Sequence, residues 1–204
     1  ITGEDLMVEG VVGVDDNDVL RLVPLNHTRM ETTFTLASAH SLVLLDDGII
    51  GDPMEKTTLE ALGWSVNQGD VILPTSNDFS HRAVITIKRR FQFSSQLKRM
   101  STVATVVTPD RQTRTMVSVK GAPEIIKTMI SNVPENYGST YKYYTRRGSR
   151  VLALAYKFVN IQGANKINEL LREQAESELA FAGFLVFTCP LKPDAIETLK
   201  MLAD

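Results

Sequence analysis

The clearest pattern along the chain is an alternation of apolar and polar residues between positions 83 and 93. A period of two residues is typical of a β-strand with one buried face. Arg89 interrupts the alternation, and the apolar face otherwise continues to the end of the segment. We therefore expect a half-buried strand whose inner face carries Ile85, Ile87, Phe91 and Phe93.

Two further apolar segments follow this strand, at residues 101–107 and 114–120. Residues 108–111, with the sequence Thr-Pro-Asp-Arg, have the composition of a turn between them. Three adjacent antiparallel strands are expected here. Such pairing would bring Lys98, before the second strand, and Lys120, at the end of the third, into one region.

Helical spacing and turn residues place the remaining elements. Proline at position 53 and glycine at position 63 mark the start and the end of one helix, because proline suits the first helical position and glycine suits the C-terminal cap. Helices are expected at 32–45, 53–62, 122–130 and 136–146, and in the charged stretch 165–179. Further strands are expected in a hairpin of 11–14 and 19–23 and at 150–157 and 180–188. Residues 68–77 mix a short apolar run, 71–73, with turn residues, and a loop is expected at 77–81.

Composition narrows the class of protein. The 204 residues are 43% hydrophobic, which suffices for one sizeable core, and the net charge of −2 does not favour a nucleic-acid partner. Cys189 is the only cysteine, so an intrachain disulfide is excluded and a reducing compartment is expected. The apolar run 181–187 is far below the roughly 20 residues of a membrane helix. Because the chain starts at Ile1 rather than methionine, we expect a piece of a larger protein.

Several familiar ligand motifs are absent. The acidic run 15–18 lacks the glycine and glutamate of a calcium loop, so we interpret it as a turn. There is no Gly-x-x-x-x-Gly-Lys-Ser/Thr loop and no Gly-x-Gly-x-x-Gly. The three histidines, at positions 27, 40 and 81, lack metal-ligand spacing, so no metal site is expected.

Two motifs indicate a nucleotide site. Phe93-Ser-Ser-Gln-Leu-Lys98-Arg-Met100 joins an aromatic ring to a lysine, and Lys120-Gly-Ala-Pro-Glu124 places a second lysine before a helix start. An aromatic face can stack on a base, and lysine supplies a point charge for phosphate oxygens. Taken singly, a phenylalanine at a strand end is more often a core residue, and a lysine is more often a solvated surface charge.

Together these two motifs resemble the nucleotide-binding domain, or N domain, of P-type ATPases. The likeness extends through Ile1-Thr-Gly3, residues 51–55 and Arg150 to Ala155, in the family's order. It implies an α+β fold in which helices flank a twisted antiparallel β-sheet. The sequence is most similar to the A subgroup of the type V pumps of the endoplasmic reticulum, which are described as moving or extracting transmembrane helices.

The resemblance assigns three residues to the adenine. Phe93 would stack on the ring, and Glu55 would orient its amino group. Leu152 would form part of an apolar wall. On the residues alone, Glu55 is better explained as a first-turn acid that complements the helix dipole.

The resemblance assigns four further residues to ATP. Lys98 and Lys120 would line the pocket, Gly121 belongs to the same motif, and Arg150 would reach the phosphates. Mg²⁺ would enter with the nucleotide in the full-length enzyme. No residue of this chain is expected to be catalytic, because the phosphorylated aspartate of the family motif would precede Ile1.

The same resemblance divides the chain. Residues 1–5 would end the hinge of the phosphorylation motif, 6–188 would form the nucleotide-binding domain, and 189–204 would be a hinge and the start of the phosphorylation domain. The expected partners are the phosphorylation and actuator domains of the same polypeptide, on the cytosolic face of the endoplasmic reticulum, and the chain is expected to be a monomer. The alternatives are a non-catalytic protein-interaction module on this fold and a cation-transporting pump of another subgroup.

Overall fold

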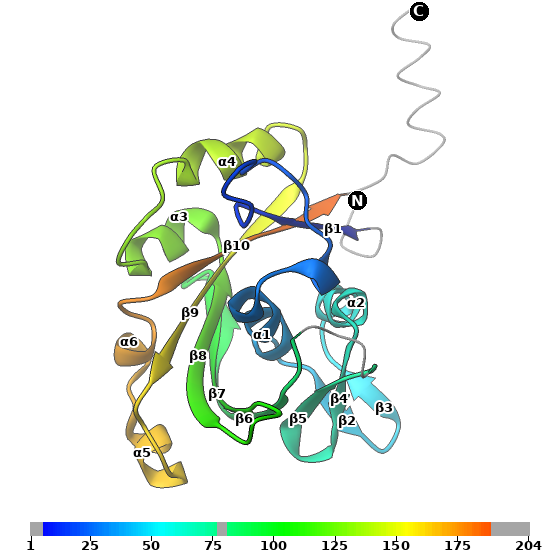
Figure 1. The fold of residues 1–204 in the computed structure, drawn as a ribbon, viewed down its shortest axis with the longest axis vertical. Helices are drawn as coiled ribbons and strands as arrows, with labels where there is room; N and C mark the ends of the chain where they lie inside the picture. The colour runs from blue at the N-terminus through cyan, green and yellow to red at the C-terminus, as the bar shows by residue number, and fades with distance from the viewer. Residues whose placement is uncertain (1–5, 77–80, 189–204) are drawn as a thin grey trace, which may run out of the picture.

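The computed structural model describes residues 6–76 and 81–188, and these form a curled antiparallel sheet with helices on both faces (Figure 1). The predicted α+β fold is confirmed. Every pairing between neighbouring strands is antiparallel, in the order β1-β10-β9-β8-β7-β6-β5-β4. The strands are β1 (Met7–Val12), β4 (Trp64–Asn67), β5 (Val71–Pro74), β6 (Val84–Ser94), β7 (Arg99–Val107), β8 (Thr113–Gly121), β9 (Arg150–Val159) and β10 (Ala180–Thr188).

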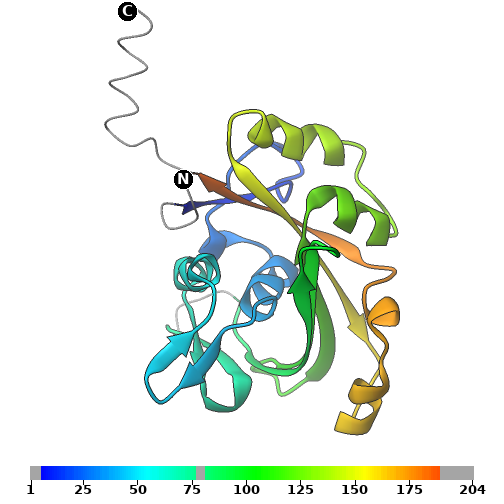
Figure 2. The same cartoon turned by 180° about the vertical axis from the view of Figure 1, so that it is seen from behind.

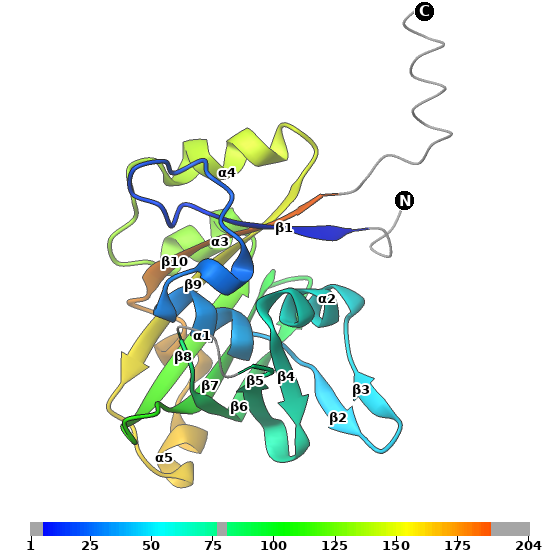
Figure 3. The same cartoon turned by 45° about the vertical axis from the view of Figure 1, so that its right-hand side comes forward.

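Two groups of helices cover the two faces of the sheet, each over its own apolar cluster. We call the face under α1 and α2 the front face and the face under α3 to α6 the back face. Figure 2 shows the molecule turned by 180° from the view of Figure 1, and Figure 3 shows it turned by 45°. A small hairpin of β2 (Val43–Leu45) and β3 (Gly48–Ile50) connects α1 to α2. The helices are α1 (Met30–Ser38), α2 (Pro53–Leu62), α3 (Pro123–Ile126), α4 (Tyr137–Thr145), α5 (Ala164–Glu169) and α6 (Arg172–Ala175), with short 3-10 turns η2 (Leu25–His27), η3 (Gln68–Asp70) and η4 (Lys127–Met129).

The predicted helix at 53–62 is confirmed, with the expected caps. The Asp52 side chain accepts a hydrogen bond from the Met54 N–H, Pro53 occupies the first helical position, and Gly63 ends the helix with φ of 84°. A left-handed C-cap favours glycine because it has no Cβ. These caps fix the start of α2, which carries Glu55.

The prediction of one helix at 32–45 is wrong in its length. α1 ends at Ser38, and residues 43–45 form β2. The imidazole of His40 folds back and bonds the Ala37 carbonyl at 2.8 Å, which satisfies a carbonyl of the last turn. Gly48 consequently lies in β3 and does not close a helix.

The prediction that one face of the 83–93 strand carries all four apolar residues is also wrong. The pairing of β6 with β7 shifts register between Ile87 and Arg89, so a bulge reverses the faces beyond that point. Ile85 and Ile87 pack in the front cluster, whereas Phe91 packs in the back cluster.

Other boundaries differ less. In the expected 11–23 hairpin, the two arms meet at the Val11–Val23 bridge and through the Gly13 N–H, which donates to the Val19 carbonyl at 2.9 Å, and residues 19–23 form no regular strand. The expected helix at 122–130 divides into α3 and η4, and the stretch 165–179 divides into α5 and α6. The predictions for residues 1–5, for most of the 77–81 loop, and for 189–204 with Cys189 lie outside the described residues.

Candidate functional site

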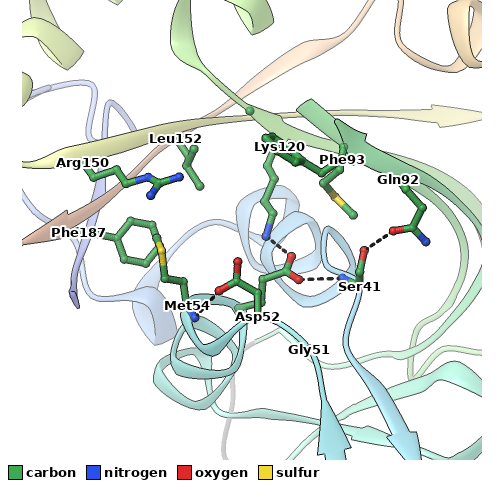
Figure 4. Close-up of a pocket in the computed structure, with 13 residues that line it drawn as sticks. Ser41, Gly51, Asp52, Met54, Gln92, Phe93, Lys120, Arg150, Leu152 and Phe187 are labelled. Atoms are coloured by element: carbon green, nitrogen blue, oxygen red, sulfur yellow. Dashed lines mark hydrogen bonds and ion pairs between the residues drawn. The ribbon is translucent and has the colours of Figure 1, made fainter. Parts of the chain in front are cut away.

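A pocket of about 330 Å³ opens on the front face, between the start of α2 and the ends of β6, β8, β9 and β10 (Figure 4). Its volume lies at the lower end of the range of small-molecule sites. Six of the seven residues expected to bind nucleotide border it. The lining consists of Ser41, Gly51, Asp52, Met54, Glu55, Gln92, Phe93, Met100, Lys120, Gly121, Arg150, Leu152 and Phe187.

Glu55 and Lys120 meet across the floor of this pocket. The Lys120 ammonium donates to Glu55 Oε2 at 2.5 Å, and the two side chains are 15% and 13% exposed. Glu55 Oε1 also accepts the Ser41 N–H at 3.1 Å. Charge-assisted bonds of this kind are short and hold both partners in place. The pocket therefore presents a fixed acceptor beside a cation.

His40 precedes Ser41 in the turn that contacts this pair, and its side chain is buried. Its Nδ1 accepts the Leu42 N–H at 3.1 Å while Nε2 bonds the Ala37 carbonyl, so the hydrogen bonds require a neutral ring protonated at Nε2. Burial, reinforced by the nearby charge of Lys120, lowers the pKa of His40 to about 4. The neutral ring of His40 thus stabilises the turn after α1, and the Ser41 N–H in this turn donates to Glu55.

Phe93 is the exposed aromatic residue at the rim of the pocket, with 61% of its surface accessible. A second register shift, between Phe91 and Ser94, inserts one extra residue into β6 here. Bulges of this kind commonly re-aim a side chain next to an active site. The bulge explains why Phe93 leaves the core while Phe91, two residues earlier, is buried.

Lys98 lies beside the pocket and does not line it. It lies at the tip of the β6–β7 hairpin, with φ of 55°, and borders a second hollow of about 560 Å³. Phe93, Arg150 and Leu152 border both hollows. The two lysines therefore border adjoining hollows, and the expectation that both line one pocket is wrong for Lys98.

Gly121 has a steric role at this junction. A Cβ there would lie 2.5 Å from the Lys98 carbonyl oxygen and 2.7 Å from the Arg99 Cβ. The Lys98 carbonyl accepts the Ala122 N–H at 3.0 Å, so the hairpin tip packs directly on the chain leaving β8. Glycine at 121 permits that approach.

Sequence reasoning missed several residues of the pocket wall. Ser41 hydrogen-bonds Gln92 at 2.9 Å, which joins the turn after α1 to β6. Phe187 of β10 and Met100 of β7 supply buried apolar wall. Met54 and Met100 belong to the recognised motifs. Ser41 and Phe187 lie in no recognisable motif, and only the tertiary fold brings them to the pocket.

The chemistry of this pocket fits ATP. An exposed ring, an ionised acceptor and two nearby cations suit the face of a purine, its amino group and phosphates, respectively. Among the described residues, no three His, Cys, Asp or Glu side chains gather into a group that could hold a metal ion. Every helix in residues 6–76 and 81–188 is too short or too polar to cross a membrane.

Comparison with known proteins shows the family of this domain. The family model for the P-type ATPase, cytoplasmic domain N, matches residues 46–194. That range includes both motifs and every expected nucleotide-binding residue. The resemblance inferred from the sequence is therefore confirmed.

Relatives match the whole chain. It is 48% identical to an endoplasmic reticulum transmembrane helix translocase of Aspergillus fumigatus and 46% identical to one of Saccharomyces cerevisiae, with 100% of the chain covered in both. A probable manganese-transporting ATPase of Arabidopsis thaliana is 37% identical, again over 100% of the chain. The chain spans 17%, 16% and 16% of these relatives, respectively. This chain belongs to the P-type ATPase family and corresponds to its cytoplasmic domain N.

Proposed function

We propose that this chain binds ATP in the front-face pocket and positions it for phosphoryl transfer to an aspartate outside the chain. The observation that carries the proposal is the exposed ring of Phe93 at the rim of a pocket that also presents Glu55, Lys120 and Arg150. A large apolar ring left 61% exposed loses the stabilisation of burial, so a stacking ligand is its natural partner.

Glu55 gives the pocket a preference for adenine. Its carboxylate accepts hydrogen bonds and cannot donate one when ionised. The adenine amino group is a donor, whereas guanine places a carbonyl acceptor at the same ring position. Glu55 therefore favours adenine, while Leu152 contributes apolar wall beside Phe93.

The cations account for the phosphates. Arg150 stands at the boundary of the two hollows, Lys120 lies inside the pocket, and Lys98 borders the second hollow. Positioning and charge neutralisation dominate phosphoryl transfer, and Mg²⁺ bound to ATP supplies further neutralisation. Alone, the chain binds nucleotide without sustained hydrolysis.

In the full-length protein, residues 6–188 are the nucleotide-binding domain, joined through 1–5 and 189–204 to the phosphorylation domain. Two relatives named as endoplasmic reticulum transmembrane helix translocases support placing it at the cytosolic face of that membrane, where ATP use would power helix dislocation. The Arabidopsis relative, named as a probable manganese transporter, favours cation transport as the second candidate.

An NMR titration of the 204-residue chain with ATP, and in parallel with GTP, tests the binding proposal. We expect shifts at Phe93, Lys98, Lys120 and Arg150, with a Kd for ATP on the order of 0.1–1 mM, equivalent to roughly −4 to −5.5 kcal/mol. GTP is expected to bind more weakly. Pocket signals that do not respond to ATP would overturn the proposal and favour a protein-interaction module.

A further inference from the structure

The β6–β7 hairpin that carries Phe93 and Lys98 is held from the back face by a buried ion cluster. Glu176, just after α6, has a side chain that is only 1% exposed and lies between two arginines. Arg99 Nε donates to its Oε2 at 2.5 Å, and Arg172 Nε donates to its Oε1 at 2.8 Å. The Ser101 hydroxyl donates to Oε1 at 2.8 Å. The carboxylate is thus fully satisfied.

Arg172 extends this cluster to both strands of the hairpin. Its Nη1 donates to the Gln92 carbonyl and its Nη2 to the Arg99 carbonyl, both at 3.0 Å. Gln92 immediately precedes Phe93, and Arg99 immediately follows Lys98. One guanidinium therefore bonds the backbone on both sides of the segment 93–98, which carries Phe93 and Lys98.

The hydrogen bonds from Arg172 lie next to the bulge at Phe93, where β6 and β7 lose part of their own pairing. A bulge disrupts the ladder between two strands, and the freed backbone groups need other partners. Phe93 itself is largely exposed, so packing of its ring does not hold the hairpin tip. Within the tip, the N–H groups of Leu97 and Lys98 bond Ser94; from outside it, Arg172 bonds one side and the Ala122 N–H bonds the Lys98 carbonyl on the other.

We infer that Arg172, anchored by Glu176, is a positioning residue for nucleotide binding: it holds the Phe93–Lys98 hairpin in the conformation that receives ATP. This inference rests on the proposed function. Without the bridge the hairpin populates other conformations, and the apparent affinity falls in proportion to the competent fraction. Neither Arg172 nor Glu176 lines either hollow, so both act through the hairpin.

The variants Arg172→Lys and Arg172→Met test this inference. Lysine keeps the charge beside Glu176 but lacks the planar fork that bridges two carbonyls. We expect Kd for ATP to rise roughly 3- to 10-fold in Arg172→Met, with a smaller rise in Arg172→Lys. Isothermal titration well below each variant's unfolding temperature measures affinity in the folded protein.

Arg89→Met is the matched control. Arg89 lies on the same back face, 4.4 Å from the Phe91 ring centre, and bonds the carbonyls of Ile167, Asn168 and Leu170. It makes none of Arg172's bonds to the hairpin backbone at residues 92 and 99. We expect Arg89→Met to lose stability and to change the Kd for ATP less than twofold.

The outcomes separate the two proposals. If the unmodified chain binds ATP and all three variants bind it equally well, the positioning inference is wrong. It is also wrong if the two Met variants lose affinity equally, because that result indicates a general loss of structure. If the unmodified chain does not bind ATP, the proposed function fails; faster amide exchange at 94–98 in Arg172→Met than in Arg89→Met would still support the bridge, and equal exchange would refute it.

Discussion

The two faces of the sheet near β6 each combine a phenylalanine, a glutamate and cations, with opposite results. On the back face, Phe91 is buried and Glu176 is saturated by two arginines and a serine. On the front face, Phe93 is 61% exposed and Glu55 pairs with one lysine inside a pocket. Residue type alone therefore does not separate structure from function. What separates them is whether the group is sealed by the rest of the protein.

The two glutamates give the largest expected contrast. Glu176→Ala leaves two arginines beside a buried vacancy, and breaking such a buried pair costs about 3–5 kcal/mol. Glu55→Ala leaves Lys120 and the Ser41 N–H without their carboxylate partner, but the pocket admits water that can replace it, so we expect a smaller cost of about 1–2 kcal/mol. Urea denaturation at neutral pH measures both. Similar losses of unfolding free energy in the two variants would contradict the claim that Glu176 is a structural residue and Glu55 a pocket residue.

The pH dependence of the free energy of unfolding tests the role of His40 on the front face. Burial lowers the pKa of His40 to about 4 in the folded chain, from an ordinary value of 6.5 that also holds in the unfolded chain. As pH falls, the unfolded chain therefore takes up a proton at His40 before the folded chain does. Stability is then fully present above pH 6.5 and is lost as pH falls toward 4, by about 3 kcal/mol in total.

Urea denaturation across this pH range, with His40→Gln as the comparison, isolates the contribution of the imidazole. The variant is expected to show a flatter profile. Identical pH slopes in the two proteins would contradict the assignment of a buried, neutral His40 in the turn after α1.

Gly121→Ala tests the junction between the hairpin and β8. The added methyl would meet backbone oxygen at 2.5 Å, so we expect a loss of about 1–3 kcal/mol and weaker ATP binding. Gly138→Ala in α4 is the control, because nothing lies within 4 Å of its Cβ position, and alanine there should stabilise by about 0.5–1 kcal/mol. Equal stability of Gly121→Ala and the unmodified chain would remove the steric argument.

Much of the fold was predictable because its patterns are local. The caps of α2 and the strands β6, β7 and β8 follow from proline, glycine and two-residue periods. The bulges in β6 were not predictable, since a register shift depends on the partner strand. For that reason the sequence placed Phe91 and Phe93 on one face with Ile85.

The candidate site was predictable to a similar extent. The two motifs pointed to Phe93 and Lys120, and the resemblance to the P-type ATPases assigned Glu55. Arg172 and Glu176 lie in a charged stretch that predicts only a helix. Their proposed positioning role rests on a contact across 80 positions of the chain, between Arg172 and Gln92, which no local pattern contains.

The most direct test of the account is a paired measurement on Phe93→Ala and Phe91→Ala. For each variant, ATP affinity is measured by titration and the free energy of unfolding by urea denaturation. We expect Phe93→Ala to weaken ATP binding by about 1–3 kcal/mol with little change in stability, and Phe91→Ala to cost about 3–5 kcal/mol of stability. Loss of folding in Phe93→Ala, or unchanged ATP affinity in that variant, would contradict the account.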